Sequence, residues 1–287
     1  MPLAAMDEII KPAHAAGRGV GAFNVISIEH AEAIVAGAEA AAAPVVLQIS
    51  ENCVAYHGAL APVARACLAI ASLATVPVTV HLDHAASVSL VEEAGELGVA
   101  SVMYDASRLP YADNVRSTAD VARWCHERGI WVEAELGEIG GKDGVHAPDA
   151  RTDPAEAARF ATATEVDALA VAVGSSHAML TRDAVLDLGL IAAIRQAVSV
   201  PLVLHGSSGV PDGNLVAAVR AGMTKVNIAT QLNKVFTAAV RRTLSDEPAT
   251  VDPRKYGAAG RDAVTSEVAR LLRLLGGGTD EPLSPVE

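Results

Sequence analysis

Eight short hydrophobic runs recur along the chain, and they constrain its fold more than any other feature of the sequence. Their centres lie roughly 22 to 38 residues apart, the length that a parallel strand, a crossover helix and two loops need. The runs occupy residues 20–24, 45–49, 78–82, 101–104, 130–135, 168–173, 202–205 and 225–228. Eight such units predict an α/β protein built as a closed (β/α)8 TIM barrel.

An open, doubly wound sheet with a small extra lobe is the alternative to the barrel. Its first strand-to-helix turn normally carries a glycine-rich GxGxxG sequence, whereas this chain reads Asn-Val-Ile-Ser-Ile at residues 24–28. No change of composition marks a domain boundary. We therefore expect residues 1–275 to form a single domain, and residues 276–287 to form a disordered tail.

Several helix ends carry recognisable signals. Ser89 and Glu92 have the spacing of a capping box. Asp153, Pro154 and Glu156 have the residue types of a helix N-terminus, and Gly222 is typical of a helix end. A linker at 245–256 is expected to lead to an added C-terminal helix at 261–275.

Composition excludes some classes of partner. The 34 acidic and 22 basic residues give a net charge of −12, which argues against nucleic acid but not against a small phosphorylated ligand. No apolar run is long enough for a transmembrane helix, so no membrane partner is expected. Cys53, Cys67 and Cys125 form no CxxC pair, and no signal peptide is visible at the N-terminus, so we expect a cytoplasmic protein.

Polar residues fall where the predicted strands end. In a barrel all the carboxyl ends of the strands open on one face, which is where active sites of this fold lie. Chance would scatter polar residues over both ends, so the pattern indicates a functional site. The residues concerned are Asn24, Gln48, Ser50, Asp83, His84, Asp105, Glu135, His177, His205 and Asn227.

Three histidines of this set predict a metal centre. His84, His177 and His205 follow strands three, six and seven, and three neutral imidazoles with an open fourth position make a catalytic zinc-type site. The alternative is that each is a hydrogen-bonded structural histidine. Asp83 is placed either for proton transfer at a hydroxyl or for orienting a histidine ligand.

Two further carboxylates each have two possible roles. Asp105 and Glu135 are either groups that orient the histidines or ligands of an alternate metal position. His81 alternates with Asp83 and is expected to help orient the site. The Gly/Asp/Pro-rich segment 137–151 is long enough to suggest a functional lid.

Glycines and hydroxyls after strands seven and eight predict a phosphate cradle. The first segment reads His-Gly-Ser-Ser-Gly at 205–209 and the second Asn-Ile-Ala-Thr at 227–230. Lys225 is expected to start strand eight, at the end of the barrel opposite the site. With no lysine at the mouth, a Schiff-base mechanism is disfavoured and a metal is left as the electron sink.

Motifs along nearly the whole chain resemble those of the class II, metal-dependent ketose-bisphosphate aldolases, which include fructose- and tagatose-bisphosphate enzymes. HLDH at 81–84 and LHGSSG at 204–209 are the most specific pair. The other matching stretches are AFNV at 22–25, PVVLQ at 44–48, VEAELG at 132–137 with Gly140 and Gly141, TDP at 152–154, AVAVG at 170–174, TKVNIAT at 224–230 and DPRKY at 252–256.

The resemblance implies an aldehyde-lyase of carbohydrate metabolism, as in glycolysis. It would cleave a ketose bisphosphate, fructose 1,6-bisphosphate first among the candidates, to dihydroxyacetone phosphate and an aldehyde phosphate. Zn²⁺ or another divalent transition metal is implied at His84, His177 and His205, with a monovalent cation as a further expectation. Asp83 would be the acid/base at the C4 oxygen. A homodimer or homotetramer is also implied.

The resemblance also assigns substrate-binding positions. Phosphate contacts are implied at Gly206, Ser207, Ser208, Asn227, Ile228, Ala229, Thr230 and the position of Ala178. Asn24 and Ser50 match other substrate-contacting positions. A carboxylate of the 137–151 loop, Asp143 here, would protonate the carbanion.

Departures from the family pattern leave alternatives open. Ala178 replaces a glycine after the second histidine, Ala106 replaces the glycine of an Asp-Gly-Ser motif, and Lys142-Asp143 replaces a glutamate-rich pair. A tagatose-bisphosphate or deoxy-sugar-acid phosphate aldolase, a metal-dependent sugar-phosphate isomerase or epimerase, and a non-catalytic phosphosugar-binding barrel therefore remain as alternatives.

Overall fold

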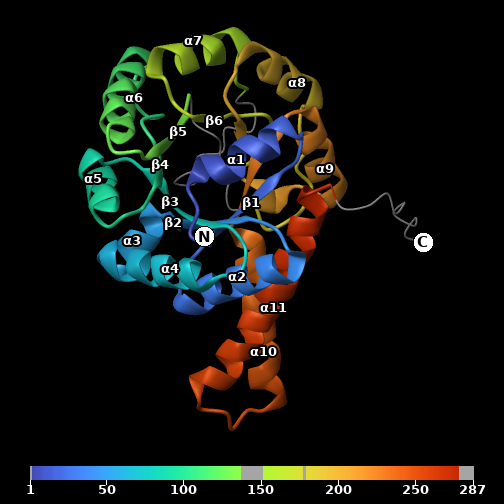
Figure 1. Ribbon diagram of the computed structural model, residues 1–287. Helices are drawn as coiled ribbons and strands as arrows, with labels where there is room; N and C mark the ends of the chain where they lie inside the picture. Colours follow the sequence, from blue (N-terminus) through green and yellow to red (C-terminus); the bar gives the residue numbers. More distant parts are fainter. Residues whose placement is uncertain (1, 137–150, 177–178, 278–287) are drawn as a thin grey trace.

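Eight parallel strands close into a barrel in chain order, from β1 beside β2 round to β8 beside β1 (Figure 1). The structure is a computed structural model and describes residues 2–136, 151–176 and 179–277. The closed ring of eight parallel strands confirms the predicted TIM barrel. The strands are β1 Val20–Asn24, β2 Val45–Ser50, β3 Val78–Ala85, β4 Ser101–Tyr104, β5 Trp131–Glu135, β6 Ala168–Ala170, β7 Leu202–Leu204 and β8 Met223–Ile228.

Helices surround the barrel and bury its outer face. Their apolar sides pack on the Val- and Leu-rich outward faces of the strands in one extensive core. The helices are α2 Ile28–Ala41, α3 Glu51–His57, α4 Ala61–Leu73, α5 Val88–Glu96, α6 Tyr111–His126, α7 Pro154–Thr164, α8 Leu188–Ala197, α9 Asp212–Ala221, α10 Thr230–Asp246 and α11 Pro253–Leu275. Among these described helices none is long and apolar enough to cross a membrane alone, although α3 and α4 meet that test as a pair bent by 115°.

The added C-terminal helix is longer than the sequence predicts. α11 begins at Pro253, not at residue 261, because the Asp252 side chain caps it by accepting a hydrogen bond from the Arg254 N–H at 3.0 Å. α10 and α11 pack side by side and extend away from the barrel (Figure 1). The last ten residues of the predicted tail, 278–287, lie outside the described residues.

Two other local predictions differ from the structure. α5 begins at Val88 with Ser87 before it, so Ser89 lies in the first turn and the capping box at Ser89 and Glu92 is wrong. β6 ends at Ala170 and not at residue 173. By contrast, Asp153 accepts a hydrogen bond from the Glu156 N–H at 2.8 Å, and Gly222 ends α9 with φ +132°, both as predicted.

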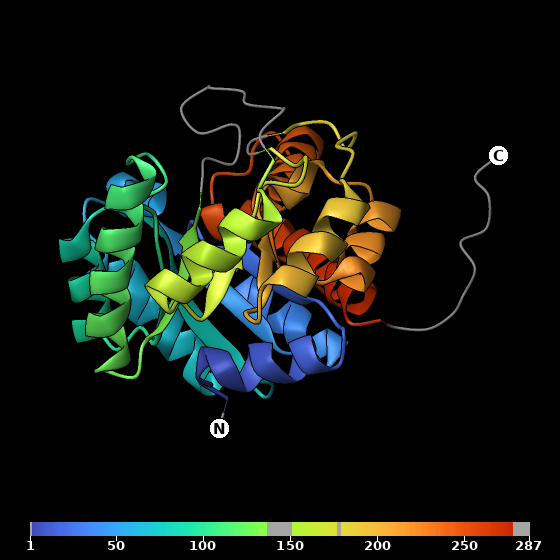
Figure 2. The ribbon, with the colours of Figure 1, turned by 90° about the horizontal axis from the view of Figure 1, so that it is seen from above.

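A short N-terminal helix closes one end of the barrel. α1 Met6–Ala15 lies across the N-terminal ends of the strands (Figures 1 and 2). Its Met6, Ile9 and Ile10 pack with inward-facing strand residues such as Val46 and Met103 in a second buried cluster. The apolar half of the barrel interior is therefore filled from below, and the polar half lies toward the carboxyl ends of the strands.

Candidate active site

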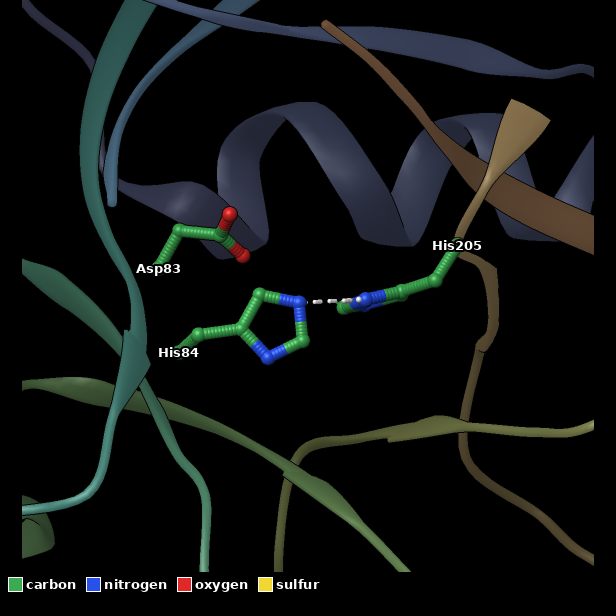
Figure 3. Close-up of side chains that lie close together, drawn as sticks. All are labelled: Asp83, His84 and His205. Atoms are coloured by element: carbon green, nitrogen blue, oxygen red, sulfur yellow. Dashed lines mark hydrogen bonds between the residues drawn. The ribbon is translucent and has the colours of Figure 1, made fainter. Parts of the chain in front are cut away.

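The end of β3 brings two adjacent side chains to the same site. Successive strand residues normally point to opposite faces, but the pairing of β3 with β4 shifts register between Leu82 and Ala85. His84 there has a left-handed backbone, with φ +55°. Such a conformation is strained for a residue with a side chain and is concentrated at functional sites. As a result Asp83 and His84 both project from β3 toward His205 (Figure 3).

His84 and His205 converge on one point. The Nε2 atom of His84 lies 2.9 Å from Nδ1 of His205, and the rings stand edge to face with centroids 4.7 Å apart. A carboxylate oxygen of Asp83 lies within 4.8 Å of both nitrogens. Two imidazoles from opposite sides of the barrel, and a carboxylate beside them, thus share one small volume (Figure 3).

Asp105 orients the far side of the His84 ring. Its Oδ2 lies 2.9 Å from His84 Nδ1, and its Oδ1 accepts hydrogen bonds from the N–H and hydroxyl of Ser107. An acceptor at Nδ1 places the ring proton there, so Nε2 is the nitrogen that can bind a metal. Glu135, buried at the end of β5, joins His84 and Asp105 in a second group with ligand atoms within 4.8 Å.

The interior of the barrel below this site holds a charged pair that sequence reasoning missed. Glu133 and Lys225 are fully buried, and the Lys225 Nζ atom lies 2.9 Å from Glu133 Oε2. The other oxygen of Glu133, Oε1, lies 3.0 Å from His205 Nε2. Lys225 is the third residue of β8 and lies inside the barrel, so its placement at the start of that strand, on the opposite end, is wrong. The available signal was two-residue spacing: Glu133 alternates with Glu135, and Lys225 with Asn227.

His81 lies beside the same pair. Its Nδ1 is 2.7 Å from the Ser101 hydroxyl, and its Nε2 is 3.9 Å from Glu133 Oε2. Complete burial, helped by the positive charge of Lys225, holds the pKa of His81 well below its usual value. His81 is therefore a neutral part of the wall under the site.

A chain of amides positions Asp83. Gln48 donates from Nε2 to the Asn24 Oδ1 atom at 3.2 Å, and Asn24 donates from Nδ2 to Asp83 Oδ2 at 3.3 Å. Burial by itself would raise the pKa of the Asp83 carboxyl. The positive charge that His84, His205 and Lys225 can carry outweighs burial, so the pKa lies below its ordinary value.

The loops after β7 and β8 meet at the same end of the barrel. Gly206 has φ +66° and leads into a short 3-10 helix, Ser207–Gly209. The Ser208 hydroxyl accepts hydrogen bonds from the Ala229 and Gln231 N–H groups at 3.2 and 3.1 Å, at the N-terminus of α10. Backbone N–H groups and a helix N-terminus of this kind favour anions. Ser50, paired in register with Asp83, has its hydroxyl 3.2 Å from the Cys53 N–H.

Three predicted site residues lie outside the described residues: His177, Ala178 and Asp143. The role of His177 as a third histidine ligand is therefore still a prediction. Ala106, another departure from the family pattern, follows Asp105 in the chain and is buried.

The donor set that is described fits a divalent metal. Imidazole nitrogens with a neighbouring carboxylate suit Zn²⁺ and also other divalent transition metals. His84 and His205 could bind it directly, with Asp83 beside it. Asp105 and Glu135 could orient His84 or hold an alternate position.

Comparison with known proteins agrees with this architecture. The family model for class-II fructose-bisphosphate aldolase matches residues 4–279. A fructose-bisphosphate aldolase of Geobacillus stearothermophilus is 37% identical over 280 residues, which cover 96% of this chain and 98% of that protein.

Solved structures extend the likeness to three dimensions. The crystal structure of the YdjI aldolase from Escherichia coli K12 has a TM-score of 0.85 and 32% identity, covering 96% of this chain and 97% of that one. A fructose-bisphosphate aldolase from Campylobacter jejuni, 20% identical with a TM-score of 0.82 over 95% of each chain, shares the fold. The predicted resemblance is confirmed: this chain is an aldolase that belongs to the class II fructose-bisphosphate aldolase family.

Proposed function

We propose that this chain catalyses the reversible, metal-dependent aldol cleavage of fructose 1,6-bisphosphate to dihydroxyacetone phosphate and an aldehyde phosphate. One observation carries the proposal. His84 Nε2 and His205 Nδ1 meet at 2.9 Å beside Asp83, at the mouth of a barrel whose relatives include a fructose-bisphosphate aldolase.

The metal would be held by His84 and His205, with His177 as the expected third ligand and Zn²⁺ or a similar ion as the occupant. Such an ion would supply a Lewis acid, which would polarise the ketose carbonyl and stabilise the negative charge left when the C3–C4 bond breaks. The chain supplies its orientation, because Asp105 fixes which nitrogen of His84 faces the ion.

Asp83 is the proposed base at the C4 hydroxyl. Its lowered pKa keeps the carboxylate ionised at neutral pH, so it can accept the hydroxyl proton as the carbon–carbon bond breaks. The hydrogen bond from Asn24 restricts the carboxylate to one orientation. In the reverse direction the same group returns the proton.

The loops after β7 and β8 would hold the phosphate of dihydroxyacetone phosphate. Gly206, Ser207 and Ser208 lie against the start of α10, where Asn227–Thr230 approach them. The helix N-terminus and the glycine-rich backbone give an anion site without a buried lysine. Asn24 and Ser50 would contact the ketose, and Ala178 the phosphate.

The remaining predictions belong to the same proposal. Residues 1–275 would act as one catalytic domain, in the cytoplasm, where the three free cysteines would stay reduced. Proton return by Asp143, a monovalent cation site and assembly as a homodimer or homotetramer stay predictions.

A metal-removal assay with a triose-phosphate readout tests the function. EDTA should abolish cleavage of fructose 1,6-bisphosphate, and Zn²⁺ or another divalent ion should restore it. Running the C4 epimer, tagatose 1,6-bisphosphate, in parallel ranks the two substrates. Full activity after thorough metal removal would contradict the metal-dependent mechanism, and sugar conversion without triose release would favour an isomerase or epimerase.

A further inference from the structure

His205 has two polar neighbours at one ring nitrogen, and they require different protonation states of that nitrogen. Its Nε2 lies 3.0 Å from Glu133 Oε1 and 3.0 Å from Asn227 Nδ2. A carboxylate only accepts hydrogen bonds, so it requires a proton on Nε2. An amide nitrogen only donates, so it requires Nε2 to carry a lone pair. The position of one proton therefore decides which ring nitrogen of His205 can bind a metal.

The surroundings of Glu133 favour the carboxylate as the partner. Glu133 and the imidazole of His205 are fully buried, so no bulk water competes for either group. Lys225 lies 2.9 Å from the second oxygen, Oε2, and balances the charge of a carboxylate that would otherwise be isolated inside the barrel. With Oε2 facing Lys225, Oε1 is directed at His205.

We propose that Glu133, held by Lys225, is a positioning residue that keeps a proton on Nε2 of His205 and so reserves Nδ1 for the metal. This inference rests on the proposed metal-dependent function. In this proposal Glu133 has the same role at His205 that Asp105 has at His84: each carboxylate accepts the ring proton on one nitrogen and leaves the other nitrogen available to the metal. One carboxylate behind each ring directs the opposite nitrogen toward the shared point.

The proton on Nε2 also sets the orientation of the Asn227 amide. With Nε2 protonated, the amide nitrogen of Asn227 cannot donate to it, whereas the amide oxygen can accept from it. A half-turn of the amide brings the oxygen to His205 and directs the N–H group away from it. Glu133 thus also sets the orientation of a side chain proposed to contact substrate.

A double variant, Glu133→Leu with Lys225→Met, tests the role without leaving a lone buried charge. Replacing a buried ion pair by apolar residues of similar size is often neutral for stability, whereas removing one partner is strongly destabilising. In this variant no carboxylate holds the proton at Nε2, and the Asn227 nitrogen can donate to that atom. The Nε2 atom of His84, 2.9 Å from His205 Nδ1, can accept from a proton placed on Nδ1, so the proton should move there. Asp167→Asn is the matched control, because Asp167 makes a carboxylate–histidine contact with His126 at 2.9 Å, outside the site.

The first readout is the protonation of His205 in the metal-free protein. Long-range ¹H–¹⁵N spectra of histidine-labelled protein distinguish a protonated from an unprotonated ring nitrogen, and His205→Gln assigns the signal among the nine histidines. We expect Nε2 of His205 to be protonated in the wild type and in Asp167→Asn, and unprotonated in the double variant. An unprotonated Nε2 in the wild type would overturn the inference.

The second readout is the dissociation constant for Zn²⁺, measured by competition with a chromogenic chelator. The loss of such an orienting group typically weakens metal binding by about 10- to 100-fold. We expect this loss in the double variant but not in Asp167→Asn, with circular dichroism confirming that both are folded. A folded double variant with wild-type Zn²⁺ affinity would overturn the inference, while the aldolase assay could still succeed. If the double variant does not fold, the ¹H–¹⁵N spectrum of the wild type still decides the inference, because it needs no substitution in the buried pair: a protonated Nε2 of His205 supports the proposal and an unprotonated Nε2 overturns it.

Discussion

His84 Nε2 lies 2.9 Å from His205 Nδ1, although 121 residues separate the two in the chain. Each ring has a carboxylate on its far side, Asp105 for His84 and Glu133 for His205. Nitrogens directed at one another in this way suit a shared cation. Metal binding at these two nitrogens can therefore be tested by replacing either ring.

Removal of either imidazole should remove the metal. His84→Gln and His205→Gln keep polar side chains of similar length but lose the imidazole ligand. We expect each variant to retain far less than one Zn²⁺ ion per chain after dialysis, as measured by elemental analysis. Each should also lose cleavage activity. His126→Gln, at a histidine on the outer surface, is the control and should bind metal as the wild type does. Full metal occupancy in both site variants would show that these rings are not ligands.

Asp83→Asn should separate metal binding from proton transfer. The amide has the same shape as the carboxylate but cannot accept the C4 hydroxyl proton. General acid–base groups contribute roughly 10²- to 10⁴-fold to rates, so kcat should fall by about that factor. The Zn²⁺ content should stay at the wild-type level, because the imidazoles are untouched. A kcat near that of the wild type would leave Asp83 an orienting group only.

The sequence predicts the barrel and the place of the site well because both depend on periodic signals. Hydrophobic runs at crossover spacing predict the strands, and polar residues at their ends predict the mouth. The inward turn of His84 was not predictable in this way, since it depends on a register shift between β3 and β4 and a left-handed residue. An alternating pattern alone would have placed Asp83 and His84 on opposite faces.

The buried pair of Glu133 and Lys225 was missed for a different reason. Charged residues inside a predicted strand are usually assigned to its ends or to an exposed face. Here two opposite charges lie on strands β5 and β8, almost a hundred residues apart by number, and only closure of the barrel brings them together. The helix ends with side-chain caps, such as Asp153, were predictable because their partners are three residues away.

Gly206→Ala should damage the phosphate loop. Gly206 has φ +66°, and an added Cβ would lie 2.5 Å from the Ser176 carbonyl oxygen, which is backbone and cannot move aside cheaply. The left-handed conformation alone costs a residue with a side chain about 1–2 kcal/mol. We expect a lower melting temperature and a KM for fructose 1,6-bisphosphate raised by about tenfold for each 1.4 kcal/mol of lost binding.

Gly213→Ala is the matched control for that variant. Gly213 lies in α9, and a Cβ there would meet nothing within 4 Å. Alanine is favoured over glycine in helices, so stability should be unchanged or slightly higher, with KM unaltered. Equal effects of the two substitutions would contradict a specific role for the loop backbone at Gly206.

His30 should give the protein a pH-dependent stability. It is buried on α2, and its ring stacks on Phe236 of α10 with centroids 4.9 Å apart. Burial lowers the pKa of His30 in the folded state, and the opposing effect of Glu29 is smaller. The unfolded chain therefore binds the proton first, so the free energy of unfolding falls as the pH drops below about 6.5.

His30→Phe removes the titrating group and keeps a ring against Phe236. At pH 8 it loses the contact of His30 Nδ1 with the Ser27 hydroxyl, but it also removes a buried Nε2 that has no hydrogen-bond partner within the described structure. The two effects oppose each other, so stabilities at pH 8 should agree within about 1 kcal/mol. Urea unfolding between pH 8 and pH 5 should show the wild type losing more stability than the variant as the pH falls. Parallel pH profiles for the two proteins would mean that His30 does not contribute to the acid sensitivity of the fold.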